Sequence, residues 1–132
     1  RETLDKLGAK QELLIGGGLN HGGDFAKALA LGADAVFVSF PLMVAMGCNY
    51  CRLCYLGNCP KGIATQDPEL RKKINIEEAS QNIANFVKNC TEEIKMIAGA
   101  CGEDNIHKLN RDHLRALNSE MVKITKIKLV SD

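Results

Sequence analysis

Hydrophobic residues recur at two different spacings along the chain, and the change of spacing separates an α/β part from a helical part. Two short apolar runs, residues 12–15 and 34–39, are typical of buried parallel strands. The segment 25–31 between them is expected to be a helix, with Asp24 as its N-cap and Gly32 after its end. Strand, helix and strand predict a βαβ unit, in which both strands end at the same edge of the sheet.

Beyond residue 75, the hydrophobic residues follow the spacing of three and four that is typical of an amphipathic helix. We expect one long helix with Asn75 as N-cap and Gly102 past its end. Cys90 lies on the apolar stripe, where it is expected to act as a small buried hydrophobic residue. Shorter helices are predicted for five segments: one ending before Gly8, residues 41–46, the turn after Pro68, residues 111–117 after Asn110, and residues 120–125 after Ser119.

The loop between the first strand and the first helix, residues 16–24, contains five glycines. Glycine allows backbone N–H groups to approach an anion, and a helix N-terminus adds a favourable partial charge, so the loop is a candidate phosphate site. The sequence contains no G-x-x-x-x-G-K-[ST] motif. It does not match G-x-G-x-x-G either, because His21 stands where the last glycine of that motif would be. A tight turn without a ligand therefore remains the alternative.

Four of the six cysteines, Cys48, Cys51, Cys54 and Cys59, lie within twelve residues at the spacing C-x2-C-x2-C-x4-C-P. Thiolates in a short loop can converge on a soft metal at small entropic cost. The triple spacing and the final Cys-Pro favour an iron-sulfur cluster over zinc, which usually takes two separated pairs of cysteines. Buried structural thiols or a disulfide are the alternatives, and Cys101 is interpreted as a spare thiol.

The composition changes this picture little. The chain has 132 residues and a net charge of +1, with no basic stripe, so it is not expected to bind nucleic acid. The longest apolar stretch, residues 35–48, is too short for a membrane span. Clustered cysteines suit a reducing cytoplasm, and the start at Arg1 suggests a fragment of a longer protein. His107 and His113 are expected to be solvated, and no catalytic residue is assigned.

Several of these segments carry a family resemblance. Residues 17–19, residues 24–36, Gly47-Cys48 and above all the run 57–71 resemble the C-terminal part of the FMN-binding synthase domain of glutamate synthases, and the resemblance continues to residue 117. It implies an α/β fold: the last two strands of a (β/α)8 barrel with their phosphate loop (1–47), an iron-sulfur loop and connector (48–71), and a C-terminal helical region (72–132).

The resemblance also implies cofactors and the residues that bind them. Cys48, Cys54 and Cys59 match the ligands of a [3Fe-4S] cluster, and Cys51 supplies a fourth thiol that would allow a [4Fe-4S] cluster. The residues that match the FMN phosphate loops are Gly17, Gly18, Ser39 and Phe40. The chain departs from the family at Asn20, where the family usually has Arg, and at Ser39-Phe40, where it usually has Gly-Thr.

In that family, electrons pass from ferredoxin or a pyridine-nucleotide-linked donor through the cluster to FMN, which reduces the imine formed from 2-oxoglutarate and glutamine-derived ammonia. Two strands cannot close a barrel, so the remaining glutamate synthase domains or subunits are expected partners and the isolated chain is expected to be inactive. Two other functions stay open from the residues: a flavin-free iron-sulfur module for electron transfer, and a zinc-stabilised structural module.

Overall fold

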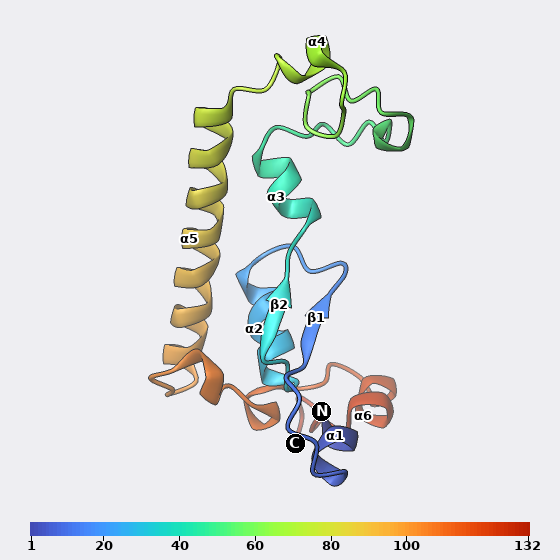
Figure 1. The fold of residues 1–132 in the computed structure, drawn as a ribbon. Coiled ribbons are helices and arrows are strands. Elements are labelled where there is room, and N and C mark those ends of the chain that lie inside the picture. The colour runs from blue at the N-terminus through green and yellow to red at the C-terminus, as the bar shows by residue number, and fades with distance from the viewer. The chain divides into compact units, whose positions relative to one another are not determined.

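The computed structural model describes all 132 residues and divides them into two compact units (Figure 1). The first unit comprises residues 1–37 and 91–132, and the second comprises residues 38–90. One long helix, α5 (Ile76–Ala100), begins in the second unit and ends in the first. No helix is both long enough and apolar enough to cross a membrane.

The first unit contains the predicted βαβ arrangement. Strand β1 (Leu14–Gly16) pairs in parallel with β2 (Ala35–Phe37), and α2 (Gly22–Ala30) connects them and packs against β2. Leu14 is aligned with Ala35 and Gly16 with Phe37, so the two strands end together. The α/β class is confirmed as a two-stranded parallel sheet with helices, and a barrel is not formed by these residues.

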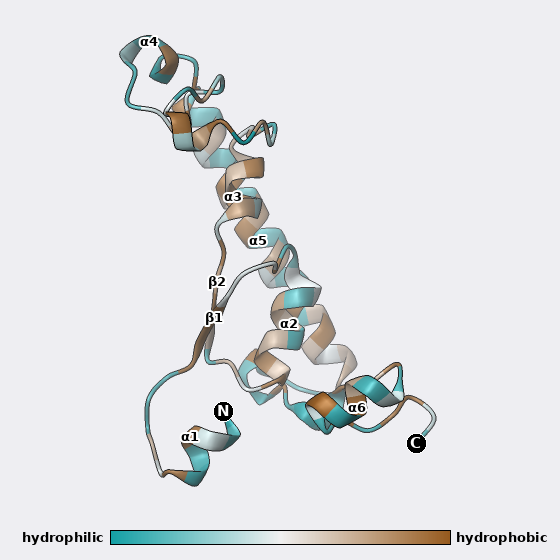
Figure 2. Ribbon diagram, turned by 90° about the vertical axis from the view of Figure 1, so that its right-hand side faces the viewer, coloured by the Kyte–Doolittle hydropathy of each residue, from teal (hydrophilic) through white to brown (hydrophobic).

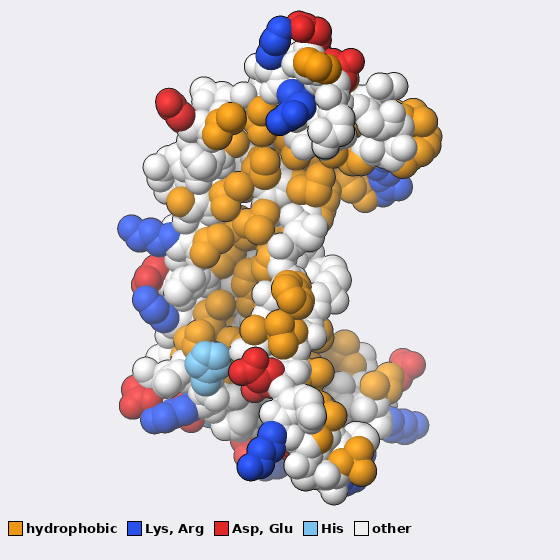
Figure 3. All heavy atoms as spheres, in the orientation of Figure 1, with side chains coloured by type: hydrophobic (Ala, Val, Ile, Leu, Met, Phe, Trp, Pro, Cys, Tyr) orange, Lys and Arg blue, Asp and Glu red, His pale blue; other side chains and the backbone are white.

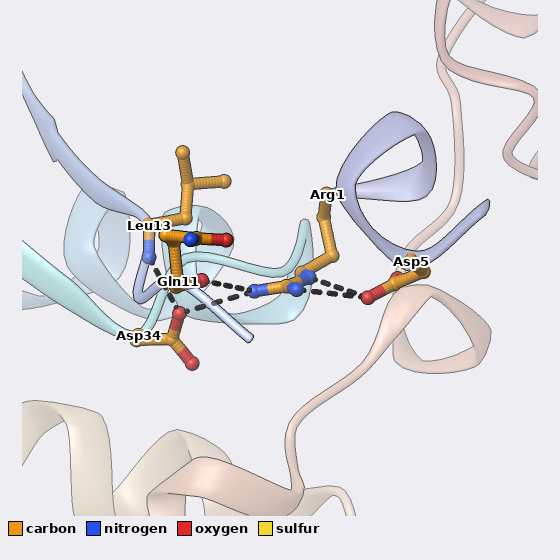
Figure 4. A network of polar contacts seen from close by, with 5 residues as sticks. All are labelled: Arg1, Asp5, Gln11, Leu13 and Asp34. Carbon is orange, nitrogen blue, oxygen red and sulfur yellow. Dashed lines mark hydrogen bonds and ion pairs between the residues drawn. The ribbon is translucent and has the colours of Figure 1, made fainter. Parts of the chain in front are cut away.

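A polar network joins the two strands where they begin (Figure 4). The Asp34 carboxylate accepts a hydrogen bond of 2.7 Å from the Leu13 N–H, and the Asp34 N–H donates to the Leu13 carbonyl at 2.8 Å. The Arg1 guanidinium lies 3.3 Å from the same carboxylate and from the Gln11 carbonyl, and it also pairs with Asp5. These contacts fix the register of the strands at the end opposite the glycine loop.

Both strands were expected to be buried, and this prediction is wrong for the chain as it stands. Leu14, Ile15 and Phe37 are 45%, 39% and 67% exposed, although the strands are strongly hydrophobic in Figure 2. The reason is that α2 packs against only one face of the sheet, and a two-stranded sheet has two open edges. Each strand thus has the hydrophobic sequence of a buried strand, but this chain does not bury either of them.

The remaining elements of the first unit are short. Helix α1 (Glu2–Lys6) ends at Leu7, and the left-handed Gly8 follows as predicted. Residues 111–117 form a single 3₁₀ turn, Arg111–His113, instead of the predicted helix, because Ala116 pairs with Leu129 in a parallel bridge. Helix α6 (Ser119–Thr125) is capped by the side chain of Asn118 and not by Ser119.

Two histidines were expected to be solvated, and for His113 this prediction is wrong. Its imidazole is largely covered, lies 3.4 Å from the Glu103 carboxylate and accepts a hydrogen bond from the Asn110 N–H at 3.2 Å. His113 thus closes a capping box on the 3₁₀ turn. Its role is structural, and His107 remains exposed.

Alanine makes up half of the buried hydrophobic residues of the first unit. Helix α2 supplies half of the buried positions, and α5 supplies two more from its C-terminal part. The buried hydrophobic residues are Phe25, Ala26, Ala28, Leu29, Ala30, Ile94, Ala98, Leu109, Ala116 and Ile127.

The second unit is organised around α3 (Phe40–Ala45), a 3₁₀ turn at Cys54–Leu56, α4 (Pro68–Arg71) and the first part of α5. The N-cap predicted for α5 is confirmed, because the Asn75 side chain accepts a hydrogen bond of 3.2 Å from the Glu78 N–H. The helical turn predicted after Pro68 is also confirmed, as α4. Cys90 is buried, as the apolar stripe predicts.

The core of the first unit predicts a contrast between two residues of α5. Ile94 is 8% exposed and Met96 is 75% exposed. Ile94→Ala should lower the free energy of unfolding by about 2–5 kcal/mol, because it leaves a cavity. Met96→Ala, on the same helix, should change it by less than about 0.5 kcal/mol. Urea denaturation followed by circular dichroism measures both, and equal losses would contradict the assigned core.

Candidate functional site

The four cysteines of the loop occupy distinct environments within the second unit. Cys48 follows α3 and Cys54 begins the 3₁₀ turn. Cys48 and Cys51 are half-buried and Cys54 is exposed, whereas Cys59 is only 4% exposed. The structure places all four in one loop, and it does not bring any three of them together into a group that could hold a metal ion. Their assignment as ligands remains a prediction from the sequence.

The buried Cys59 has an environment suited to a thiolate. Hydrogen bonds from the backbone N–H of Ala64, and also from those of Lys61, Ile63 and Gly62, hold the pKa of the Cys59 thiol below its ordinary value, while burial opposes them. The thiolate is the form that binds metal. The donor chemistry of the loop thus fits an iron-sulfur cluster or another soft metal, and Cys59 is the thiol whose ionised form is already stabilised.

The part of the loop between Cys48 and Cys54 is strained. Tyr50 and Arg52 both have positive φ angles, 59° and 58°, in a region that costs a non-glycine residue about 1–2 kcal/mol. The conformation is supported by side-chain contacts, because the Arg52 guanidinium lies 4.4 Å from the centre of the Tyr50 ring and that ring meets Phe40 edge-on at 4.9 Å. The Tyr50 N–H also points at the Cys48 sulfur, at 3.5 Å. Strain of this kind is typical of ligand-binding loops.

The glycine loop lies after β1 in the first unit. Gly17 and Gly18 have positive φ angles of 104° and 71°, and there is open space beside both where a side chain would project. Asn20 crosses the turn, since its side-chain amide donates to the Gly18 carbonyl at 2.9 Å. An open, glycine-lined turn before a helix is compatible with an anion such as a phosphate.

Helix α2 begins at Gly22, so the prediction that Asp24 is its N-cap is wrong. His21 occupies the N-cap position without a side-chain hydrogen bond, and the carboxylate of Asp24 accepts instead from the Asn20 N–H at 3.1 Å. Lys27 lies 2.9 Å from this carboxylate. The His21 imidazole is 3.5 Å from Asp24 and 3.6 Å from Glu93 of α5. Sequence reasoning missed these partners because Glu93 is distant in the chain.

Ser39 and Phe40 follow β2 and belong to the second unit, whereas Gly17 and Gly18 belong to the first. Within the first unit, Gly16 is aligned with Phe37, so β1 and β2 end at the same edge of the sheet. The Ser39 carbonyl accepts from the Met43 N–H at 3.1 Å, and Phe40 contacts Tyr50.

Comparisons with known proteins agree on one family. Residues 2–104 match a family model described as a conserved region in glutamate synthase. The archaeal glutamate synthase [NADPH] of Methanocaldococcus jannaschii is 42% identical over 99% of this chain, and that of Archaeoglobus fulgidus is 42% identical over 84%. A glutamate synthase large subunit-like protein of Rhizobium meliloti is 38% identical over 97%.

This chain covers only part of each of these relatives: 27% of the Methanocaldococcus protein, 22% of the Archaeoglobus protein and 33% of the Rhizobium protein. It therefore spans between about a fifth and a third of their length. No solved structure matches the chain at a significant level.

The contacts of Asp24 predict an acid-sensitive glycine loop. The hydrogen bond from Lys27, and then that from the Asn20 N–H, lower the pKa of Asp24. A lowered native pKa stabilises the fold above the unfolded-state pKa of about 3.9, and this stabilisation is lost as the pH falls through the native pKa. Asp24→Asn should therefore lower the melting temperature at pH 6, and this effect should disappear as the pH falls through the lowered native pKa of Asp24.

Lys27→Gln serves as the companion variant, because it removes the first cause of the lowered pKa and leaves the carboxylate in place. It should act in the same direction as Asp24→Asn. Thermal unfolding of the three proteins between pH 2 and pH 7 measures the effect, and a difference between wild type and Asp24→Asn that does not change with pH would contradict the assignment.

Proposed function

The chain belongs to the glutamate synthase family, and from this premise we propose that it is the part of such an enzyme that holds an iron-sulfur cluster and the phosphate of FMN. In this role it would serve the transfer of electrons from a donor to the flavin. The overall reaction would be the reductive formation of glutamate from 2-oxoglutarate and ammonia released from glutamine.

The observation that carries this proposal is the environment of Cys59. A thiol that is almost fully buried, with hydrogen-bond donors that favour its ionised form, has little use as a structural hydrophobic residue. It is suited to a metal ligand, and three further thiols lie within eleven residues of it in the chain. We assign Cys48, Cys54 and Cys59 as ligands of a [3Fe-4S] cluster, with Cys51 as an additional thiol.

When bound, the cluster would carry single electrons and the flavin would use them to reduce an imine. The residues of this chain would have simpler tasks. Cys59 would bind the cluster as a thiolate. The backbone N–H groups that donate to its sulfur would also partly compensate the negative charge of a bound cluster. Gly17, Gly18 and the backbone at Ser39-Phe40 would hold the phosphate of FMN at the edge where both strands end.

The exposed strands support a role inside a larger protein. Hydrophobic side chains such as Leu14, Ile15 and Phe37 would be covered by further parts of the enzyme, because the relatives are about three to four times as long as this chain. Hydrophobic side chains reach the surface in Figure 3. The proposed electron source is NADPH, through a linked subunit or domain, because relatives carry NADPH in their names. The isolated chain would be inactive.

Low-temperature EPR of the anaerobically purified full-length protein tests this proposal. We expect a signal in the protein as isolated that disappears on one-electron reduction, as for a [3Fe-4S] cluster. Cys51→Ser should leave this signal unchanged, whereas Cys59→Ser should abolish it, because only the second variant removes an assigned ligand.

Two other outcomes would count against the proposal. A signal that appears only after reduction and is lost in Cys51→Ser would replace the three-ligand assignment by a [4Fe-4S] cluster with Cys51 as a ligand. Absence of any signal in both states, together with bound zinc, would overturn the electron-transfer function in favour of a structural module.

A further inference from the structure

The segment that follows Cys59 has a geometry that neither the cysteine spacing nor the family resemblance explains. The chain turns back after Cys59, with the Gly62 N–H donating to the Cys59 carbonyl at 3.1 Å. The backbone N–H groups of residues 61–64, which follow within and after this turn, donate toward the Cys59 sulfur. Gly62 closes the turn with a φ angle of 76°.

Gly62 is packed against backbone and not against flexible side chains. A Cβ atom at this position would overlap the carbonyl oxygen of Leu70, which lies in α4, and would come within 3.3 Å of the Ile74 nitrogen. Backbone atoms in a capped turn cannot move aside as the end of a side chain can. The turn after Cys59 can therefore pack closely against α4 because residue 62 is a glycine, which has no side chain.

The surface on which Gly62 rests is itself fixed. The Asp67 carboxylate caps α4 by accepting from the N–H groups of Glu69 at 2.8 Å and Leu70 at 3.1 Å. The Thr65 hydroxyl in turn accepts from the Asp67 N–H at 3.1 Å. Thr65 is the buried polar residue of the chain, so this hydrogen bond is sheltered from water.

We propose that Gly62 is a positioning residue: by seating the turn 59–62 against α4, it aims the backbone N–H groups of residues 61–64 at the sulfur of Cys59. Cys59 is then the preset member of the cysteine loop, and the other two assigned ligands, Cys48 and Cys54, come to it when a metal or cluster binds. The metal-binding consequence rests on the proposed function, whereas the positioning of Cys59 does not. Nothing about the cysteine spacing requires one ligand to be fixed before the others.

Gly57 provides a matched control. It lies in the same loop with nearly the same φ angle, 70° against 76°, but a Cβ atom there would meet nothing within 4 Å. Gly62→Ala and Gly57→Ala therefore carry similar backbone strain and differ in the overlap with α4. The comparison isolates the effect of the close approach.

The readout is the rate at which iodoacetamide alkylates each cysteine in the metal-free full-length protein at about pH 10, resolved by mass spectrometry. At this pH an ordinary thiol is already ionised, so the rate reports access to the sulfur and not the fraction of thiolate. In the wild type, Cys59 should react more slowly than the exposed Cys54. Gly62→Ala should raise the rate at Cys59 by about tenfold or more, because the turn no longer shelters it, and Gly57→Ala should leave that rate unchanged. Cys90, buried on α5, should keep its slow rate in both variants and so report an intact fold.

If Gly62→Ala unfolds the unit and exposes Cys90, Thr65→Val provides a second test. It removes the hydrogen bond that the Thr65 hydroxyl accepts from the Asp67 N–H and leaves Gly62 unchanged, so it should raise the alkylation rate of Cys59 while Cys90 stays protected. Equal Cys59 rates in the wild type and in both of these variants would overturn the positioning role, whatever metal the protein holds. Absence of iron from the wild-type protein would instead overturn the proposed function and leave the alkylation comparison valid.

Discussion

A thiolate is stable inside a protein only where donors or a metal compensate for the water it has lost, and the cysteine loop is built on one place where this condition is met. Cys59 is buried and receives hydrogen bonds from successive backbone N–H groups. Those donors exist because the chain turns sharply at Gly62 and rests on α4, which Asp67 caps. The rest of the loop is less constrained, and its strained residues, Tyr50 and Arg52, lie between the cysteines that would have to move.

A second constraint acts on the sheet. Two parallel strands with a helix on one face cannot bury their own hydrophobic residues, and here the strands remain exposed. The relatives are about three to four times as long as this chain, so they contain further residues that this chain lacks. Within the first unit, both strands end at the same edge of the sheet.

Hydrophobic periodicity was sufficient to predict the local elements. It predicted the βαβ unit and the long helix α5, and the cap at Asn75 and the helical turn after Pro68 followed from local sequence. Two of the errors have non-local causes. The helix expected at 111–117 is cut short because Ala116 pairs with Leu129, and the strands are exposed because a two-stranded sheet with a helix on one face cannot cover them.

The candidate site could be predicted only in part. Cysteine spacing identifies which residues are candidate ligands, since spacing controls the cost of bringing them together. It does not distinguish Cys59 from Cys54, because the difference comes from backbone donors and burial that depend on where Gly62 and α4 meet. The Cys-Pro-Lys-Gly sequence was the only local signal of that turn.

Determination of iron, acid-labile sulfide and zinc in the anaerobically purified full-length protein would show directly whether the cysteine loop holds an iron-sulfur cluster. We expect iron and sulfide in the proportion of a [3Fe-4S] cluster, and loss of both in a Cys59→Ser variant that still folds. Stoichiometric zinc without sulfide, or iron and sulfide that persist in Cys59→Ser, would contradict it.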